Sequence, residues 1–124
     1  MSADHPKYRC VDNCLIDIKT GTLIRCGRNA VIPTDGSIKC IGEYAFQDFS
    51  DLLSDVILPH GITRIEEYAF SGLDHITSIV IPAGVTIIED GTFEECCNLT
   101  RVTLPASLTE IGDEAFRNCK KLLC

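Results

Sequence analysis

Apolar and polar positions recur along most of the chain with a fixed spacing. Two independent markers show it, namely prolines that follow an apolar residue and the phenylalanines that come after them. The prolines are Pro59, Pro82 and Pro105, and the phenylalanines are Phe70, Phe93 and Phe116. Successive members of each set are 23 residues apart, and each phenylalanine lies 11 residues after its proline. The chain therefore repeats one structural unit, and that unit decides the fold.

An earlier copy of the unit is less regular. Pro33 and Phe46 are 13 residues apart, because two extra residues fall in the turn-rich stretch 34–37. One further residue is inserted near Ser50, before Pro59. The pattern predicts about four coils, which are listed here by their approximate bounds: 29–53, 54–76, 77–99 and 100–124.

The apolar positions of a coil predict which side chains face inward. In the last coil they are Leu104, Leu108, Ile111 and Phe116, and the equivalent positions of earlier coils are also apolar. The stretches 77–81 and 85–88 are rich in β-branched residues and predict two short strands. In most coils an acidic residue and an alanine precede the phenylalanine, which predicts a helical or 3₁₀ turn.

A unit of 23 residues cannot bury its own apolar side chains, so the coils must stack on one another. We therefore expect one β-rich α/β domain, a solenoid whose short parallel strands stack in a right-handed superhelix. Residues 10–28 predict a β-hairpin cap around Lys19–Gly21 that covers the first coil of a solenoid spanning 29–124. Residues 1–9 are expected to form a flexible tail.

The segment Leu104–Cys119 follows the pattern Ile-Pro-x-x-Val-x-x-Ile-Gly-x-x-Ala-Phe-x-x-Cys almost throughout. This pattern resembles the BspA-like leucine-rich repeat, and Asn13–Asp17 with Thr20–Ile24 is similar to a lead-in found beside such repeats. The resemblance covers about residues 10–124, with substitutions in the earlier coils. It implies a leucine-rich-repeat solenoid that serves in protein binding, adhesion or surface display, and it offers no catalytic residues to carry over.

The charge of the chain argues against nucleic acid as a partner. Eighteen acidic and eleven basic residues give a formal charge of −7, which repels phosphate backbones and anionic lipid surfaces. No stretch approaches the roughly 18 consecutive apolar residues of a membrane span, so membrane insertion is not expected. The start, Met1–Lys7, has charge and proline where a secretory signal has its apolar region. The compartment stays unknown, although the resemblance favours a secreted or cell-surface location.

The eight cysteines permit several interpretations. Cys96 and Cys119 share an inward slot with Leu73 and Phe49, so we interpret them as buried core residues. Their separation by one coil also permits a disulfide. The other six lie off this ladder, and some could pair near the hairpin in an oxidising compartment, with no connectivity favoured.

Neither the cysteines nor the acidic residues predict a metal site. The closest cysteine spacings, Cys10 with Cys14 and the adjacent Cys96–Cys97, lack a matching histidine pair. One column of equivalent positions is acidic and comprises Glu43, Glu67, Asp90 and Asp113. We interpret these carboxylates as caps of the following turn, with a bound cation such as calcium as the alternative. No metal and no cofactor are expected.

The candidates for nucleophilic catalysis do not converge. A cysteine or serine nucleophile needs a base within hydrogen-bond reach, and the three histidines lie in a tail, after a proline and in a turn. They are His5, His60 and His75. Because the sequence also lacks a glycine-rich phosphate loop and a paired-carboxylate motif, we do not expect an enzyme.

A solenoid displays its outward positions in columns, which suits binding to another protein. On the strand before the proline, side chains alternate between the core and solvent. Alternation predicts an exposed column of Val31, Ile57, Val80 and Thr103, beside a column of Asn29, Asp55, Ser78 and Arg101. These eight residues are the candidate partner-binding face, because contiguous exposed apolar surface often marks an interface. Strand propensity alone is the competing explanation.

The sequence ends at Lys121–Cys124, where a further strand is expected and no polar capping coil follows. We expect either a fragment of a longer array or self-association through this end, as a homo-oligomer. Three functional hypotheses follow: a non-enzymatic binding or adhesion module in a surface-associated protein, a structural spacer or self-assembling repeat segment, and a cysteine-based metal or redox protein. The identity of the protein partner is not encoded in any recognisable motif.

Overall fold

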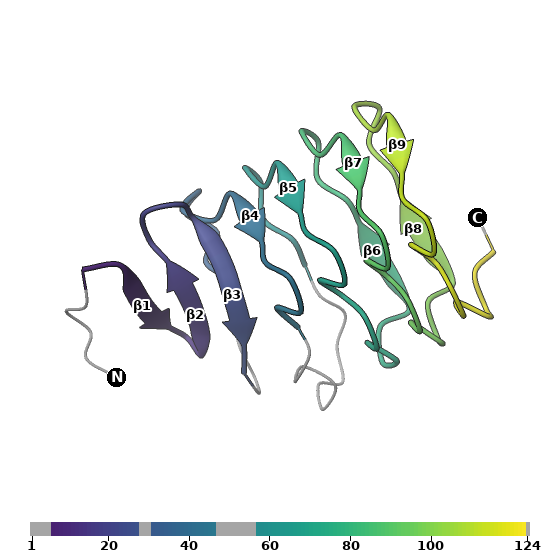
Figure 1. Ribbon diagram of the computed structural model, residues 1–124, viewed down its shortest axis with the longest axis horizontal. Coiled ribbons are helices and arrows are strands. Elements are labelled where there is room, and N and C mark those ends of the chain that lie inside the picture. Colours follow the sequence, from purple (N-terminus) through teal and green to yellow (C-terminus); the bar gives the residue numbers. More distant parts are fainter. Residues whose placement is uncertain (1–5, 28–30, 47–56, 124) are drawn as a thin grey trace.

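The computed structural model describes residues 6–27, 31–46 and 57–123, and this part of the chain contains nine strands and no helix. The strands are β1 (Tyr8–Val11), β2 (Cys14–Asp17), β3 (Thr22–Cys26), β4 (Cys40–Ile41), β5 (Arg64–Ile65), β6 (Ser78–Val80), β7 (Ile87–Ile88), β8 (Arg101–Thr103) and β9 (Glu110–Ile111). They succeed one another along one axis, so that neighbouring coils lie side by side (Figure 1). This arrangement is the predicted solenoid, in which each coil contacts its neighbours.

Three antiparallel strands lead into the first parallel ladder. β1 pairs with β2 and β2 with β3, after which β3 pairs in parallel with β4, and β4 with β5. Asp17 holds the β2–β3 turn, because its carbonyl accepts a hydrogen bond from the Gly21 amide and its carboxylate accepts one from the Lys19 amide. β1 begins at Tyr8, within the segment for which the sequence predicts a tail, since pairing with β2 satisfies its backbone groups.

The strand register reproduces the period of the sequence. β6 pairs with β8 so that Ser78 lies beside Arg101, and β7 pairs with β9 so that Ile88 lies beside Ile111. Each pair of residues is 23 positions apart. One period of sequence therefore corresponds to one coil of the solenoid. This register confirms the predicted stacking of short parallel strands.

The phenylalanines form a continuous stack through the core. Ring centroids are 4.7 Å apart between Phe46 and Phe70, 5.2 Å between Phe70 and Phe93, and 5.3 Å between Phe93 and Phe116. These distances approach the spacing of about 4.8 Å between hydrogen-bonded strands. The backbone ladder thus sets the ring separation, and the rings stack because they repeat at the same position in each coil.

A second core column contains the thiols of the third and fourth coils. Cys96 is fully buried in the slot that Leu73 occupies one coil earlier, as the sequence predicts, and Cys119 is half-buried. The Cys96 thiol donates to the Phe70 carbonyl at 3.1 Å, and the Cys119 thiol donates to the Phe93 carbonyl at 3.0 Å. Burial raises the pKa of Cys96 to about 12. Both thiols are therefore neutral hydrogen-bond donors that join adjacent coils.

The predicted helical or 3₁₀ turns before the phenylalanines are not confirmed, because the described residues form no helix. Each coil makes a β-turn instead, as where the Ala69 amide donates to the Glu66 carbonyl. The third residue of each turn has a positive φ: 58° at Tyr44, 59° at Tyr68, 66° at Gly91 and 58° at Glu114. A left-handed residue stops a right-handed run after one turn, so a helix cannot propagate.

Hydrogen bonds between coils hold two of these left-handed residues, Tyr68 and Gly91, in place. The Tyr68 amide donates to the Asp90 carbonyl, and the Gly91 amide donates to the Asp113 carbonyl, each at 3.3 Å. A left-handed conformation costs about 1 kcal/mol at a residue other than glycine. At Tyr68, pairing with the neighbouring coil offsets that cost.

Replacing Phe93 by alanine tests the contribution of the ring stack. Phe93 is fully buried between two rings, so Phe93→Ala is expected to lower the free energy of unfolding by about 3–5 kcal/mol. Phe116→Ala is the matched control, and it should cost less because Phe116 is half-buried with a ring contact to Phe93. Chemical denaturation of both variants measures the difference. Equal losses would contradict a stack whose contribution follows burial.

Gly91 tests the packing of the turns. An alanine methyl group there would overlap the Tyr68 ring, whereas at Gly72, also left-handed with a φ of 79°, it would meet open space. Gly91→Ala and Gly72→Ala share the backbone strain, and only Gly91→Ala should add about 1 kcal/mol or more from overpacking. Thermal unfolding of the two variants isolates that extra term. A larger loss for Gly72→Ala would disprove the assigned ring position.

Candidate functional site

The candidate face is exposed on paired strands. Ser78 lies beside Arg101 and Val80 beside Thr103 in the β6–β8 ladder, and all four side chains are exposed. The residue between them on each strand points the other way, since Ile79 and Val102 are buried. Alternation along a strand places these side chains on opposite faces, and the parallel register then aligns them in columns.

The two remaining apolar members of the column, Val31 and Ile57, are also exposed. The exposed fractions are 61% for Val31, 83% for Ile57 and 62% for Val80. Each precedes a residue that faces the core, as Val31 precedes the buried Ile32. Asn29 and Asp55, the expected neighbours, lie outside the described residues. The face thus presents three β-branched aliphatic side chains to solvent, with the hydroxyl of Thr103 and the guanidinium of Arg101 at its later end.

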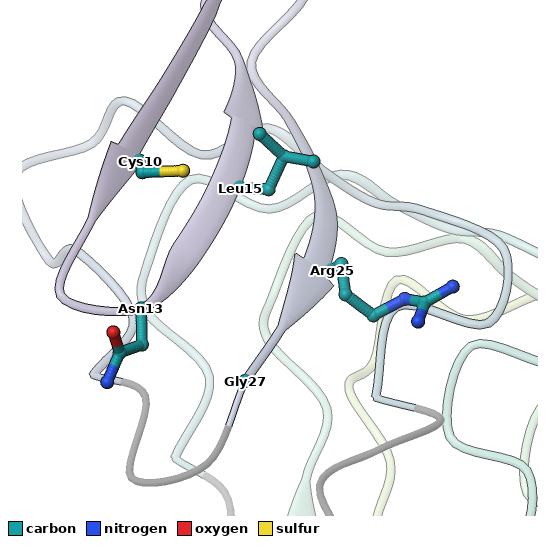
Figure 2. Close-up of a pocket in the computed structure, with 5 residues that line it drawn as sticks. All are labelled: Cys10, Asn13, Leu15, Arg25 and Gly27. Carbon is teal, nitrogen blue, oxygen red and sulfur yellow. The ribbon is translucent and has the colours of Figure 1, made fainter. Parts of the chain in front are cut away.

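An open hollow of about 520 Å³ lies on the lead-in strands. Figure 2 shows its lining: Cys10 on β1, Leu15 on β2 and Arg25 on β3, with Asn13 and Gly27 at the strand ends. Strand register explains the grouping, because Leu15 pairs with Cys10 on one side and with Arg25 on the other. The five lining residues combine an aliphatic floor with one guanidinium and include neither a histidine nor a carboxylate.

A backbone hydrogen bond links the first residue of the candidate face to the residue before Asn13 at the edge of the hollow. The Val31 amide donates to the Asp12 carbonyl at 3.0 Å, and the next residue, Asn13, lines the hollow. Sequence analysis does not predict this junction, because it depends on the pairing of β1 with β2. The run Tyr8–Val11 is too short to define a strand from the sequence alone.

The acidic column remains a surface feature. Glu43, Glu67, Asp90 and Asp113 are all exposed, and the backbone carbonyls of the two aspartates accept hydrogen bonds from left-handed residues of the preceding coils. Within residues 6–27, 31–46 and 57–123, no group of three or more histidine, cysteine or acidic side chains is arranged to hold a metal ion. The same residues include no helix long and apolar enough to cross a bilayer.

A ladder of short parallel strands, a stacked aromatic core and outward columns define a leucine-rich-repeat solenoid. The chain belongs to the family described as BspA type leucine rich repeat region, whose profile matches residues 11–123 with six copies. Sequence periodicity predicts about four coils, and the matched region also includes β2 and β3, which the sequence assigns to the cap.

Solved bacterial proteins share this fold. A leucine-rich repeat protein of T. pallidum is 31% identical, with a TM-score of 0.66, over 75% of this chain and 42% of that chain. A leucine-rich repeat protein from Eubacterium ventriosum is 18% identical, with a TM-score of 0.70, over 98% of this chain and 40% of that chain. One from Bacteroides ovatus is 22% identical, with a TM-score of 0.52, over 82% and 35%. This chain therefore spans less than half the length of these proteins. A comparison with curated proteins finds no match.

Proposed function

We propose that this chain is a non-enzymatic protein-binding module that uses the face of Val31, Ile57, Val80 and Thr103. The observation that carries the proposal is the exposure of three β-branched aliphatic side chains at one repeat position. Membership of a leucine-rich-repeat family supports it, because solenoid repeats present extended surfaces for other proteins. The finer proposal is adhesion by a surface-associated protein, which rests on resemblance to the BspA type.

The physical basis of binding is burial of this apolar surface. Fully burying a valine or isoleucine side chain that was exposed stabilises a complex by about 1.5–3 kcal/mol. Ile57 and Val80 are the most exposed members of the column in the central coils. A partner that covers both therefore gains several kcal/mol before the cost of association is subtracted. Arg101 and Ser78, beside them, supply hydrogen-bond donors that favour a partner with carbonyl or carboxylate groups.

Charged substitutions on the face test this function. A partner is first isolated by cross-linking in the cells that express the chain, then purified and titrated against Ile57→Lys, Val80→Lys and their glutamate counterparts by calorimetry. Each substitution is expected to weaken binding at least tenfold, because a charge would be buried against an apolar partner. Lysine and glutamate should weaken binding alike if apolar contact is lost. A long-range electrostatic effect would instead have opposite directions for the two charges.

The matched control is Ile87→Lys. Ile87 is an exposed β-branched residue on β7, in the other ladder, so its replacement alters charge equally without touching the face. Circular dichroism should show that all variants stay folded. Unchanged binding by the folded Ile57 and Val80 variants would disprove the site. An intact chain that binds no protein would instead favour the structural-spacer role.

A second candidate function is self-assembly through the last described coil. Leu104 and Ile111 are 44% and 47% exposed, whereas Ile81 and Ile88, their equivalents one coil earlier, are 2% and 0% exposed. The difference arises because a following coil covers Ile81 and Ile88. A second copy stacked on this coil would cover Leu104 and Ile111 in the same way, as would a further coil in a longer protein.

Light scattering across a range of concentrations tests self-assembly of the intact chain. The expected result is a concentration-dependent dimer that Ile111→Lys abolishes, because the substitution places a charge in the contact. Val80→Lys serves as the control, since Val80 lies on the strand face and not on the end of the solenoid. A strict monomer at high concentration would exclude this function.

A further inference from the structure

Two cysteines at the start of the solenoid meet in its core. Cys14 begins β2, Cys26 ends β3, and their Cα atoms are register partners. Neither side chain has exposed surface, and their sulfur atoms share a hydrogen bond at 3.7 Å. Among the residues that the structure describes, this is the one pair of thiols joined by a hydrogen bond.

The backbone around this pair has the geometry that a disulfide needs. The Gly27 amide donates to the Asn13 carbonyl at 2.9 Å, which makes Cys14 and Cys26 a non-hydrogen-bonded antiparallel pair. Cα atoms in such pairs are about 4.5 Å apart, within the range of about 4.4–6.8 Å that disulfides span. The sulfurs must approach to about 2 Å, and rotation of two side chains can supply that movement while the strands stay paired.

We propose that Cys14 and Cys26 form a reversible disulfide that fastens the lead-in strands to each other. The oxidant is a small-molecule disulfide such as oxidised glutathione. One cysteine, as its thiolate, attacks one of the two sulfurs of the oxidant, breaks the sulfur–sulfur bond and releases one glutathione thiolate. The other cysteine then loses its proton and attacks the sulfur of the first, which releases the second glutathione. The two cysteines together lose two electrons and two protons, and the glutathione disulfide gains them as two thiols.

The hydrogen bond makes the two thiols unequal in the folded protein. The hydrogen bond from Cys26 lowers the pKa of Cys14, because it stabilises the thiolate. The same hydrogen bond and burial raise the pKa of Cys26. Since both side chains are fully buried in the fold, the oxidant reaches them before the core forms, and the attack can begin at either thiol.

The other described cysteines have different surroundings. Cys96 and Cys119 donate to backbone carbonyls of successive coils, and Cys10 is exposed on β1 as the partner of Leu15. The Cys14 thiol also donates to the Val31 carbonyl at 3.3 Å, and oxidation removes this donor. The redox state of the pair therefore changes a hydrogen bond to the backbone of Val31, the first apolar residue of the candidate face. The disulfide itself does not depend on the binding role of that face.

Refolding in a glutathione redox buffer tests the disulfide, because the buried thiols are accessible to oxidant before the core forms. Cys10→Ser is the background, so that the tryptic peptide of residues 10–19 contains Cys14 as its single cysteine. After free thiols are blocked and the protein is digested without reductant, mass spectrometry should find this peptide joined to that of residues 26–28. Most of the protein is expected to contain the joined peptides, and treatment with dithiothreitol should separate them.

The stability of the same protein gives an independent readout. The oxidised form should melt about 10 °C above the reduced form, because the disulfide closes a short loop in the unfolded chain. Cys10→Ser with Cys26→Ala is the matched control and should show neither the joined peptide nor the shift. Recovery of Cys14 and Cys26 as blocked thiols after refolding in the oxidising buffer would overturn the proposal, as would a disulfide that joins either of them to another cysteine.

Discussion

The parallel strand ladder is the constraint from which the rest of the structure follows. Hydrogen bonds between coils fix their separation near the strand spacing, so residues of the paired strands β6–β8 and β7–β9 lie directly against their equivalents one period away. Phe70 and Phe93 therefore stack with centroids 5.2 Å apart, and Cys96 reaches the Phe70 carbonyl. A substitution at one of these positions changes the environment of both neighbouring coils. The free energy of unfolding of such a molecule is therefore a sum of terms for each coil and for each interface between coils.

The same constraint separates the exposed surfaces from those that hold the coils together. Side chains of the inward columns pack against the neighbouring coils. The turns make hydrogen bonds between coils, such as that from the Tyr68 amide to the Asp90 carbonyl. The outward side chains of the strands do not pack in the core between the coils. Val80 and Thr103 can therefore vary without loss of the fold, and their side chains are available to another protein.

The lead-in strands concentrate features that the regular coils lack. They convert an antiparallel sheet into a parallel ladder at β3, they form the hollow between Cys10 and Arg25, and they bury the Cys14–Cys26 pair. Antiparallel pairing is the reason for all three, because it brings side chains from non-equivalent positions together, whereas parallel stacking brings together equivalent ones. The hydrogen bond from the Val31 amide to the Asp12 carbonyl connects this region to the strand face.

The sequence by itself determined the period, the inward columns and the outward exposure of Val31, Ile57 and Val80, because apolar burial and strand alternation repeat with each coil. It could not determine the turns: the acidic residue and alanine suggest a helix start, but the Tyr68 amide donates to the Asp90 carbonyl of the next coil, which holds Tyr68 in a left-handed conformation. Nor could it choose among the cysteines. Only the tertiary structure placed Cys14 against Cys26, since their contact depends on the β2–β3 register, and a register is a property of two paired strands that neither strand specifies alone.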